Sequence, residues 1–137
     1  MIVIPGRPVP KGRPRLGVRG RRAYIYTPES TVEYERTVAL FTRQQHSKPV
    51  QGPVAVTVRI YMGPRGRGDI DNYLKSILDG LNGVVYQDDK QVVRLDACFV
   101  ACSKGEERVE IEVEQMVSAQ QQIGKEAVHD ECAAETV

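Results

Sequence analysis

The chain has 137 residues, which is enough for one domain with its own hydrophobic core. Its longest apolar run falls far short of a membrane span, and residues 1–4 are too short for the core of an export signal. An odd cysteine count without a Cys-x-x-Cys pair predicts reduced thiols in a cytoplasmic protein, with no membrane partner. The two histidines lack ligand spacing to the cysteines, which argues against a zinc site.

The net charge of +1 hides a strong asymmetry along the chain. Residues 1–28 carry +7 without a single acid, and the remainder carries −6. A basic arm on an acidic body predicts contact with phosphate, although a solvated basic loop is the alternative. Tyr24 and Tyr26 follow the basic run and could stack on bases, but we expect strand alternation to place one of them in the core. The bases of the arm are Arg7, Lys11, Arg13, Arg15, Arg19, Arg21 and Arg22.

In chain order, residues 1–4 predict a short strand, followed by a segment rich in proline, glycine and arginine at 5–22. Neither a helix nor a central strand tolerates that composition, so we expect a long mobile loop. Residues 23–26 return as a strand. Thr27-Pro28 then supplies an N-cap and a first-turn proline for a helix that extends to about residue 46.

In the second half of the chain, apolar residues at 54–62 alternate as in a half-buried strand. A basic, glycine-rich loop at 63–68 leads into a helix at 71–82. Two strands, 92–101 and 108–114, are expected to pair with each other across the turn at 103–106.

This order of elements predicts a single α+β domain with a mixed or antiparallel sheet and two main helices. The domain would cover residues 1–116. Residues 117–137 fit either a short peripheral helix or a flexible C-terminal tail, and their composition favours the tail.

Acidic residues flank the second predicted helix. Asp69 and Asp71 stand at its start, Lys75 lies one turn further, and Asp88 and Asp89 follow its end. The loop after the helix is long enough for the second pair to return to the helix start. Mg²⁺ prefers a few carboxylate oxygens and keeps water or phosphate in the rest of its shell. The pattern therefore predicts a metal-assisted phosphodiester hydrolase.

Each of these residues also has an ordinary interpretation. Asp71 could cap the helix, Lys75 could form a surface ion pair, and Asp88 and Asp89 could belong to a plain turn. Their combination under a glycine-rich, basic loop favours a site. The segment has neither the glycine and glutamate of a calcium loop nor the Gly-Lys-Ser/Thr ending of a P-loop.

These residues also resemble a known family. The run Arg65-Gly66-Arg67-Gly68-Asp69-Ile70-Asp71-Asn72-Tyr73-Leu74-Lys75, the later Asp88-Asp89-Lys90-Gln91-Val92-Val93 and the opening at residues 4–15 are similar to the RusA family of Holliday junction resolvases. The resemblance covers about residues 1–116. It implies a RusA-like α+β fold and a homodimeric endodeoxyribonuclease that uses Mg²⁺, without a small-molecule cofactor, to cut branched, four-way DNA.

The resemblance also implies roles for single residues. Asp69, Asp71 and Asp89 correspond to the catalytic, metal-binding aspartates, Lys75 to the active-site lysine, and Asp88 is a further candidate ligand. The expected DNA contacts are Arg7, Lys11, Arg13, Arg15, Arg65 and Arg67. A nuclease without junction preference, or an inactive DNA-binding relative, remains open at this point.

Overall fold

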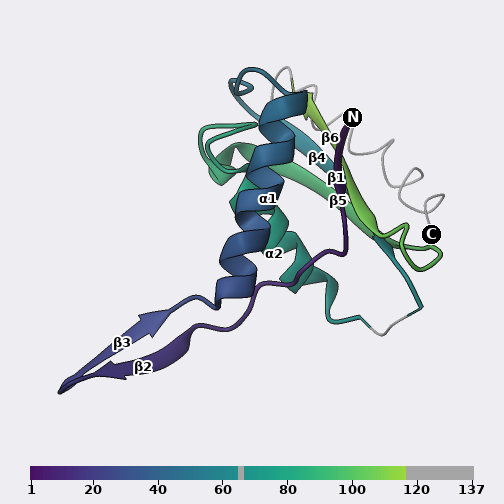
Figure 1. Ribbon diagram of the computed structural model, residues 1–137. Helices are drawn as coiled ribbons and strands as arrows, with labels where there is room; N and C mark the ends of the chain where they lie inside the picture. Colours follow the sequence, from purple (N-terminus) through teal and green to yellow (C-terminus); the bar gives the residue numbers. More distant parts are fainter. Residues whose placement is uncertain (65–66, 117–137) are drawn as a thin grey trace.

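A four-stranded mixed sheet with two helices on one face forms the body of the protein, and a two-stranded hairpin projects from it (Figure 1). The computed structural model describes residues 1–64 and 67–116. The tail predicted at 117–137 and Arg65 lie outside these residues. The elements are β1 (Ile2–Pro5), β2 (Arg15–Arg19), β3 (Arg22–Tyr26), α1 (Glu29–Gln45), β4 (Val54–Met62), α2 (Ile70–Leu81), the 3₁₀ turn η1 (Asp89–Gln91), β5 (Val92–Ala101) and β6 (Arg108–Gln115).

The strand order of the main sheet is β1-β6-β4-β5. β4 pairs antiparallel with β6 and parallel with β5, so the sheet is mixed and the predicted α+β class is confirmed. The inward-facing side chains of β4, from Val54 to Ile60, are fully buried under the helices, which explains why this strand is central. α2 is the connection that a parallel β4–β5 pair requires.

The predicted pairing of the last two strands with each other is wrong, because β4 lies between them. The turn that joins them does form, with Glu106 N–H donating to Ser103 O at 3.0 Å. Charges on the exposed face help to fix the actual order. Arg59 of β4 lies 3.4 Å from Glu110 and 3.4 Å from Glu112 of β6, pairs that only neighbouring strands can make.

The prediction of a mobile loop at 5–22 is also wrong, because most of this segment packs against the helices or forms a strand. Residues 9–12 lie between the helices: Ser76 Oγ donates to Val9 O at 2.6 Å and Lys11 N–H to Asn72 O at 2.8 Å. Beyond them β2 and β3 form an antiparallel hairpin. Gly20, in the tight turn, has φ +65°, the positive value that primed hairpin turns require at this position. Composition alone concealed the hairpin because arginine and glycine are weak strand formers.

The two edges of the main sheet differ. β1 is short, ends at Pro5, and has its free edge covered by Gln45 of α1, whose side chain accepts from Val3 N–H at 2.9 Å and donates to Val3 O at 2.8 Å. Among residues 1–64 and 67–116, β5 has a strand partner on one side only, and Val93 and Leu95 are exposed by 49% and 39%. An uncovered edge of this length is a typical site for protein association.

The helices are held close together at Gly80. A Cβ atom there would lie 2.7 Å from Val38 Cβ and 2.9 Å from Glu35 O of α1. We expect Gly80→Ala to lower the free energy of unfolding by about 1–3 kcal/mol, because crowding outweighs the better helix propensity of alanine. Urea denaturation measures this, with Asn72→Ala on the exposed face of α2 as control. An unchanged or raised stability would show that the helices can separate without cost.

Candidate active site at the two ends of helix α2

Asp69 and Asp71 occupy the first turn of α2, where the positive end of the helix favours anions. Asp69 stands at the N-cap position, yet its side chain makes no capping hydrogen bond. Both residues are exposed, and neither forms an ion pair within the described residues. An aspartate at this position normally caps the helix. The structure gives Asp69 no such role, so its carboxylate is available for a ligand.

Aromatic contacts position Arg67 and Gly68, the two residues directly before these aspartates. The Arg67 guanidinium lies 4.1 Å from the centroid of the Phe99 ring, and Phe99 meets Tyr73 edge to face at 5.7 Å. The Tyr73 hydroxyl accepts from Gly68 N–H at 3.2 Å. The Arg67 side chain is therefore held on the Phe99 ring while the residue stays exposed, two positions before Asp69 in the chain.

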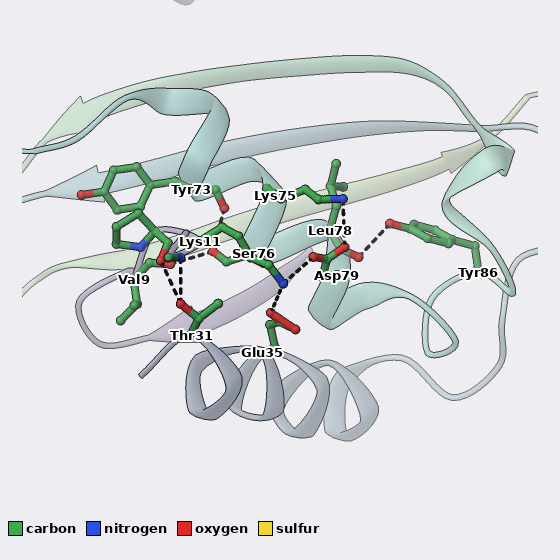
Figure 2. Close-up of polar contacts among 12 residues, drawn as sticks. Val9, Lys11, Thr31, Glu35, Tyr73, Lys75, Ser76, Leu78, Asp79 and Tyr86 are labelled. Carbon is green, nitrogen blue, oxygen red and sulfur yellow. Dashed lines mark hydrogen bonds and ion pairs between the residues drawn. The ribbon is translucent and has the colours of Figure 1, made fainter. Parts of the chain in front are cut away.

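Lys75 lies one turn after Asp71 and is exposed by 60%. Its Nζ is 3.6 Å from Asp79 Oδ1, a pair one helical turn apart (Figure 2). Such an exposed pair contributes little to stability. The ammonium group of Lys75 thus leans toward Asp79, on the same exposed side of α2, without being fixed by a strong partner.

Lys11, by contrast, is bound inside an ion-pair cluster. Its Nζ lies 2.9 Å from Glu35 Oε2 of α1 and 3.0 Å from Asp79 Oδ2 of α2 (Figure 2). Burial lowers the pKa of Lys11, but the hydrogen bonds and charges of the two carboxylates outweigh that effect and raise the pKa above its usual value. Lys11 therefore joins the helices, whereas the sequence predicted a DNA contact.

Asp88 and Asp89 have different surroundings. Asp88 caps η1: its side chain accepts from Lys90 N–H at 3.0 Å, and its own N–H donates to Gln91 Oε1 at 3.1 Å. The hydrogen bond from the Lys90 N–H is the main cause that holds the pKa of Asp88 below its usual value. Asp88 thus has a structural role as a cap. Asp89 is exposed. Burial raises the pKa of the Tyr86 hydroxyl, and the negative charge of Asp89 adds to this effect.

The two acidic pairs lie at opposite ends of α2. Tyr86 folds back on the C-terminal end of the helix, where its hydroxyl donates to Leu78 O at 3.3 Å. Gln91 Nε2 donates to Val50 O and Gly52 O, each at 2.9 Å, just before β4 begins. The 12 residues of α2 span about 18 Å. The chain therefore does not bring Asp89 back to the helix start, in contrast to the sequence-based expectation.

The donor types suit a hard divalent cation, but one copy of the chain does not gather them. Within residues 1–64 and 67–116, no group of three or more His, Cys, Asp or Glu side chains is placed to hold a metal ion. Asp69 and Asp71 together would offer two carboxylates, and a third oxygen donor at their position must come from elsewhere.

The remaining predicted DNA contacts lie on the N-terminal arm. Arg13 and Arg15 are exposed at the start of the hairpin. Arg7 pairs with Glu107 at 3.3 Å on the loop that leads into β6. Asp79 forms the surface ion pair with Lys75 that the helical spacing allowed, and it also contacts Lys11, a pair that the sequence reading did not foresee.

Comparison with known proteins identifies the family. A family model described as endodeoxyribonuclease RusA matches residues 5–114. The chain belongs to the RusA family. The matched region contains the hairpin, both helices, both acidic pairs and nearly all of the main sheet, so the resemblance seen in the sequence is confirmed. Membership supports a nuclease that acts on DNA.

The chain is also similar to the uncharacterized protein YqaN of Bacillus subtilis. The two are 29% identical over an alignment that covers 69% of this chain and 82% of YqaN. Among the described residues, no helix is long and apolar enough to cross a membrane.

The position of Lys11 leads to a stability prediction. Lys11→Met should lower the free energy of unfolding by about 1–3 kcal/mol, because Glu35 would lose its cation and would face Asp79, which would keep only the exposed Lys75 as a partner. Because the raised pKa stabilises the fold below the usual pKa of lysine, this contribution is complete at neutral pH. Chemical denaturation measures it. Arg13→Met, at an exposed position of the same arm, should change stability by less than about 0.5 kcal/mol, and an equally small effect of Lys11→Met would contradict the clamp.

Proposed function

We propose that this protein is an endonuclease that resolves four-way DNA junctions by metal-dependent hydrolysis of the phosphodiester backbone, in recombination and repair in the cytoplasm. The observation that carries the proposal is the set of exposed carboxylates at Asp69, Asp71 and Asp89 in a chain of the RusA family. Asp69 makes no capping bond, neither of the first two forms an ion pair in the described residues, and the resemblance of the sequence to the family implies that both are catalytic aspartates.

The residues would divide the work as follows. Asp69, Asp71 and Asp89 would hold the divalent cation, with Mg²⁺ the best fit to carboxylate donors. A bound cation supplies Lewis acidity and a water of lowered pKa. Lys75 would place its ammonium group near the scissile phosphate, where developing negative charge is stabilised. Arg67 and the arginines of the arm would bind backbone phosphates and orient the strand.

We further propose that the active protein is a two-fold homodimer in which each site uses carboxylates of both copies. One copy separates Asp69 and Asp71 from Asp89 by the length of α2. If the α2 helices of two copies run antiparallel across a two-fold axis, the start of one helix faces the end of the other. Asp89 of the second copy then approaches Asp69 and Asp71, and two equivalent sites arise together.

Two further features support this assembly. Val93 and Leu95, exposed on the open edge strand β5, follow Asp89 closely along the chain and provide apolar surface for an interface. A four-way junction is itself pseudo-symmetric, and its resolution needs two cuts in strands related by that symmetry. A dimer with two equivalent sites matches this requirement.

The roles of the aspartates can be tested by substitution to asparagine. Asp71→Asn and Asp89→Asn should each lower cleavage of a labelled four-way junction in Mg²⁺ by at least about a hundredfold, since each change removes a charged donor. Junction binding in EDTA should persist, because less negative charge then faces the phosphates. Asp88→Asn is the matched control: asparagine also caps helices, so cleavage should stay near the wild-type rate. Wild-type cleavage by Asp71→Asn or Asp89→Asn would remove that residue from the site.

A mixing experiment tests the shared site. Asp71→Asn and Asp89→Asn, each inactive alone, are unfolded together, refolded as a mixture and assayed for nicking of a junction. In a shared site, every mixed dimer has one site with both changes and one intact site, so nicking should recover to about a quarter of the wild-type value. If each site were built within one chain, every site in the mixture would be defective. Absence of recovery, with mixed dimers confirmed by mass spectrometry, would contradict the shared site while leaving the nuclease proposal intact.

A further inference from the structure

The projecting β2–β3 hairpin carries two chemically different faces. The cross-strand pairs Leu16↔Ile25 and Val18↔Ala23 place apolar residues on one face. The alternate pairs form the other face, which has cations at both ends and tyrosines between them. That second face, here called the arginine–tyrosine face, consists of Arg15, Gly17, Arg19, Arg22, Tyr24 and Tyr26.

Both tyrosines are available on this face. Tyr24 and Tyr26 are two residues apart and therefore point the same way, with 45% and 41% of their surface exposed. The sequence-based expectation that one of them enters the core is wrong for this reason. Their ring centroids lie 5.6 Å apart with an interplanar angle of 38°, so the rings are neighbours without covering each other.

Gly17 positions the ring of Tyr24. A Cβ atom at Gly17 would lie 2.5 Å from Tyr24 Cζ and 2.7 Å from its hydroxyl oxygen. The ring therefore rests against the bare backbone of β2, and any larger residue there would push it away. A tyrosine held in this way loses little further freedom when a planar ligand stacks on its outer side.

Within the part of the chain that the structure describes, no carboxylate competes for the cations of this face. Arg15, Arg19 and Arg22 are exposed, and none of them forms an ion pair with a carboxylate in the described residues. The first acid of the chain is Glu29, beyond the hairpin. A polyanion is thus the ligand that fits the charge, and planar groups are the ligands that fit the tyrosines.

We infer that the arginine–tyrosine face binds unpaired nucleotides, with bases stacked on Tyr24 and Tyr26 and phosphates held by Arg15, Arg19 and Arg22. Surfaces that bind single strands combine the same two features, aromatic rings for bases and cations for the backbone. Regular duplex DNA hides its base faces, whereas a branch point exposes them. Resting on the proposed function, the hairpin then distinguishes branched from linear DNA, away from the carboxylates that cut.

Binding without cleavage tests this inference. Fluorescence anisotropy in EDTA, with labelled oligothymidylate and a labelled linear duplex, compares the wild type with three double variants. Tyr24→Leu/Tyr26→Leu removes the aromatic rings, and Tyr24→Phe/Tyr26→Phe keeps them. Val18→Thr/Ile25→Thr is the control on the opposite face of the hairpin, where it makes the side chains more polar and keeps them β-branched. Circular dichroism confirms that each variant is folded.

The leucine variant should bind oligothymidylate at least about tenfold more weakly, while the phenylalanine and threonine variants stay within about twofold of the wild type. Linear duplex affinity should change by less than about threefold in all three. The salt dependence of oligothymidylate binding should stay unchanged in the leucine variant and become shallower in Arg19→Gln, by a slope of about 0.7.

Several results would overturn the inference. One is wild-type oligothymidylate affinity in the leucine variant, and another is an equal loss in the phenylalanine variant, which would point to the hydroxyl groups. A loss that extends equally to linear duplex, or a change of oligomeric mass in light scattering, would assign the face to general phosphate contact or to a protein partner. Failure of the wild type to cut any DNA in Mg²⁺ would refute the proposed function, and this binding comparison would stand independently.

Discussion

The parallel pairing of β4 with β5 is the constraint on which the placement of the site depends. Parallel neighbours require the chain to travel back along the sheet between them, and α2 is that return path. The residues before α2 and those after its terminal turn must then lie a helix length apart. Asp69 and Asp71 belong to the first group, Asp89 to the second, and no loop rearrangement short of breaking β5 from β4 would unite them.

The N-terminal arm packs against the body of the protein at residues 9–12 and then projects from it as the β2–β3 hairpin. Residues 9–12 fill the space between α1 and α2, with Lys11 joining a carboxylate from each helix. The same chain continues into a hairpin whose two strands contact mainly each other (Figure 1). A lone hairpin is only marginally stable in water. Anchoring at its base stabilises this hairpin, and the nucleic acid that we propose for its surface would add to that stability.

The paired and the unpaired charges lie on different parts of the molecule. The acidic body places Glu110 and Glu112 against Arg59 on the open face of the sheet, where the pairs compensate one another. Arginines of the hairpin lack such partners within the described residues, and so do the carboxylates of Asp69 and Asp71. The uncompensated charges of both signs thus lie where a metal ion and a nucleic acid are proposed to bind, and a highly charged substrate would supply the missing counterparts.

Local patterns in the sequence determined much of this protein. Alternation defined β4 to the residue, helical periodicity and Gly83 located α2 within one residue at each end, and the run from Arg65 to Lys75 indicated the family. These signals are local, since a strand or helix buries one face whatever its neighbours are. Three features came only from the tertiary structure: the insertion of β4 between β5 and β6, the hairpin within an arginine-rich segment, and the separation of the acidic pairs. Each depends on which distant segments compete for the same backbone and charged partners, and spacing along the chain carries no information about that competition. Asp88 and Asp89 illustrate the limit: adjacent and identical in sequence, one caps a turn and the other is free to bind, because only one of them faces the N–H groups of η1.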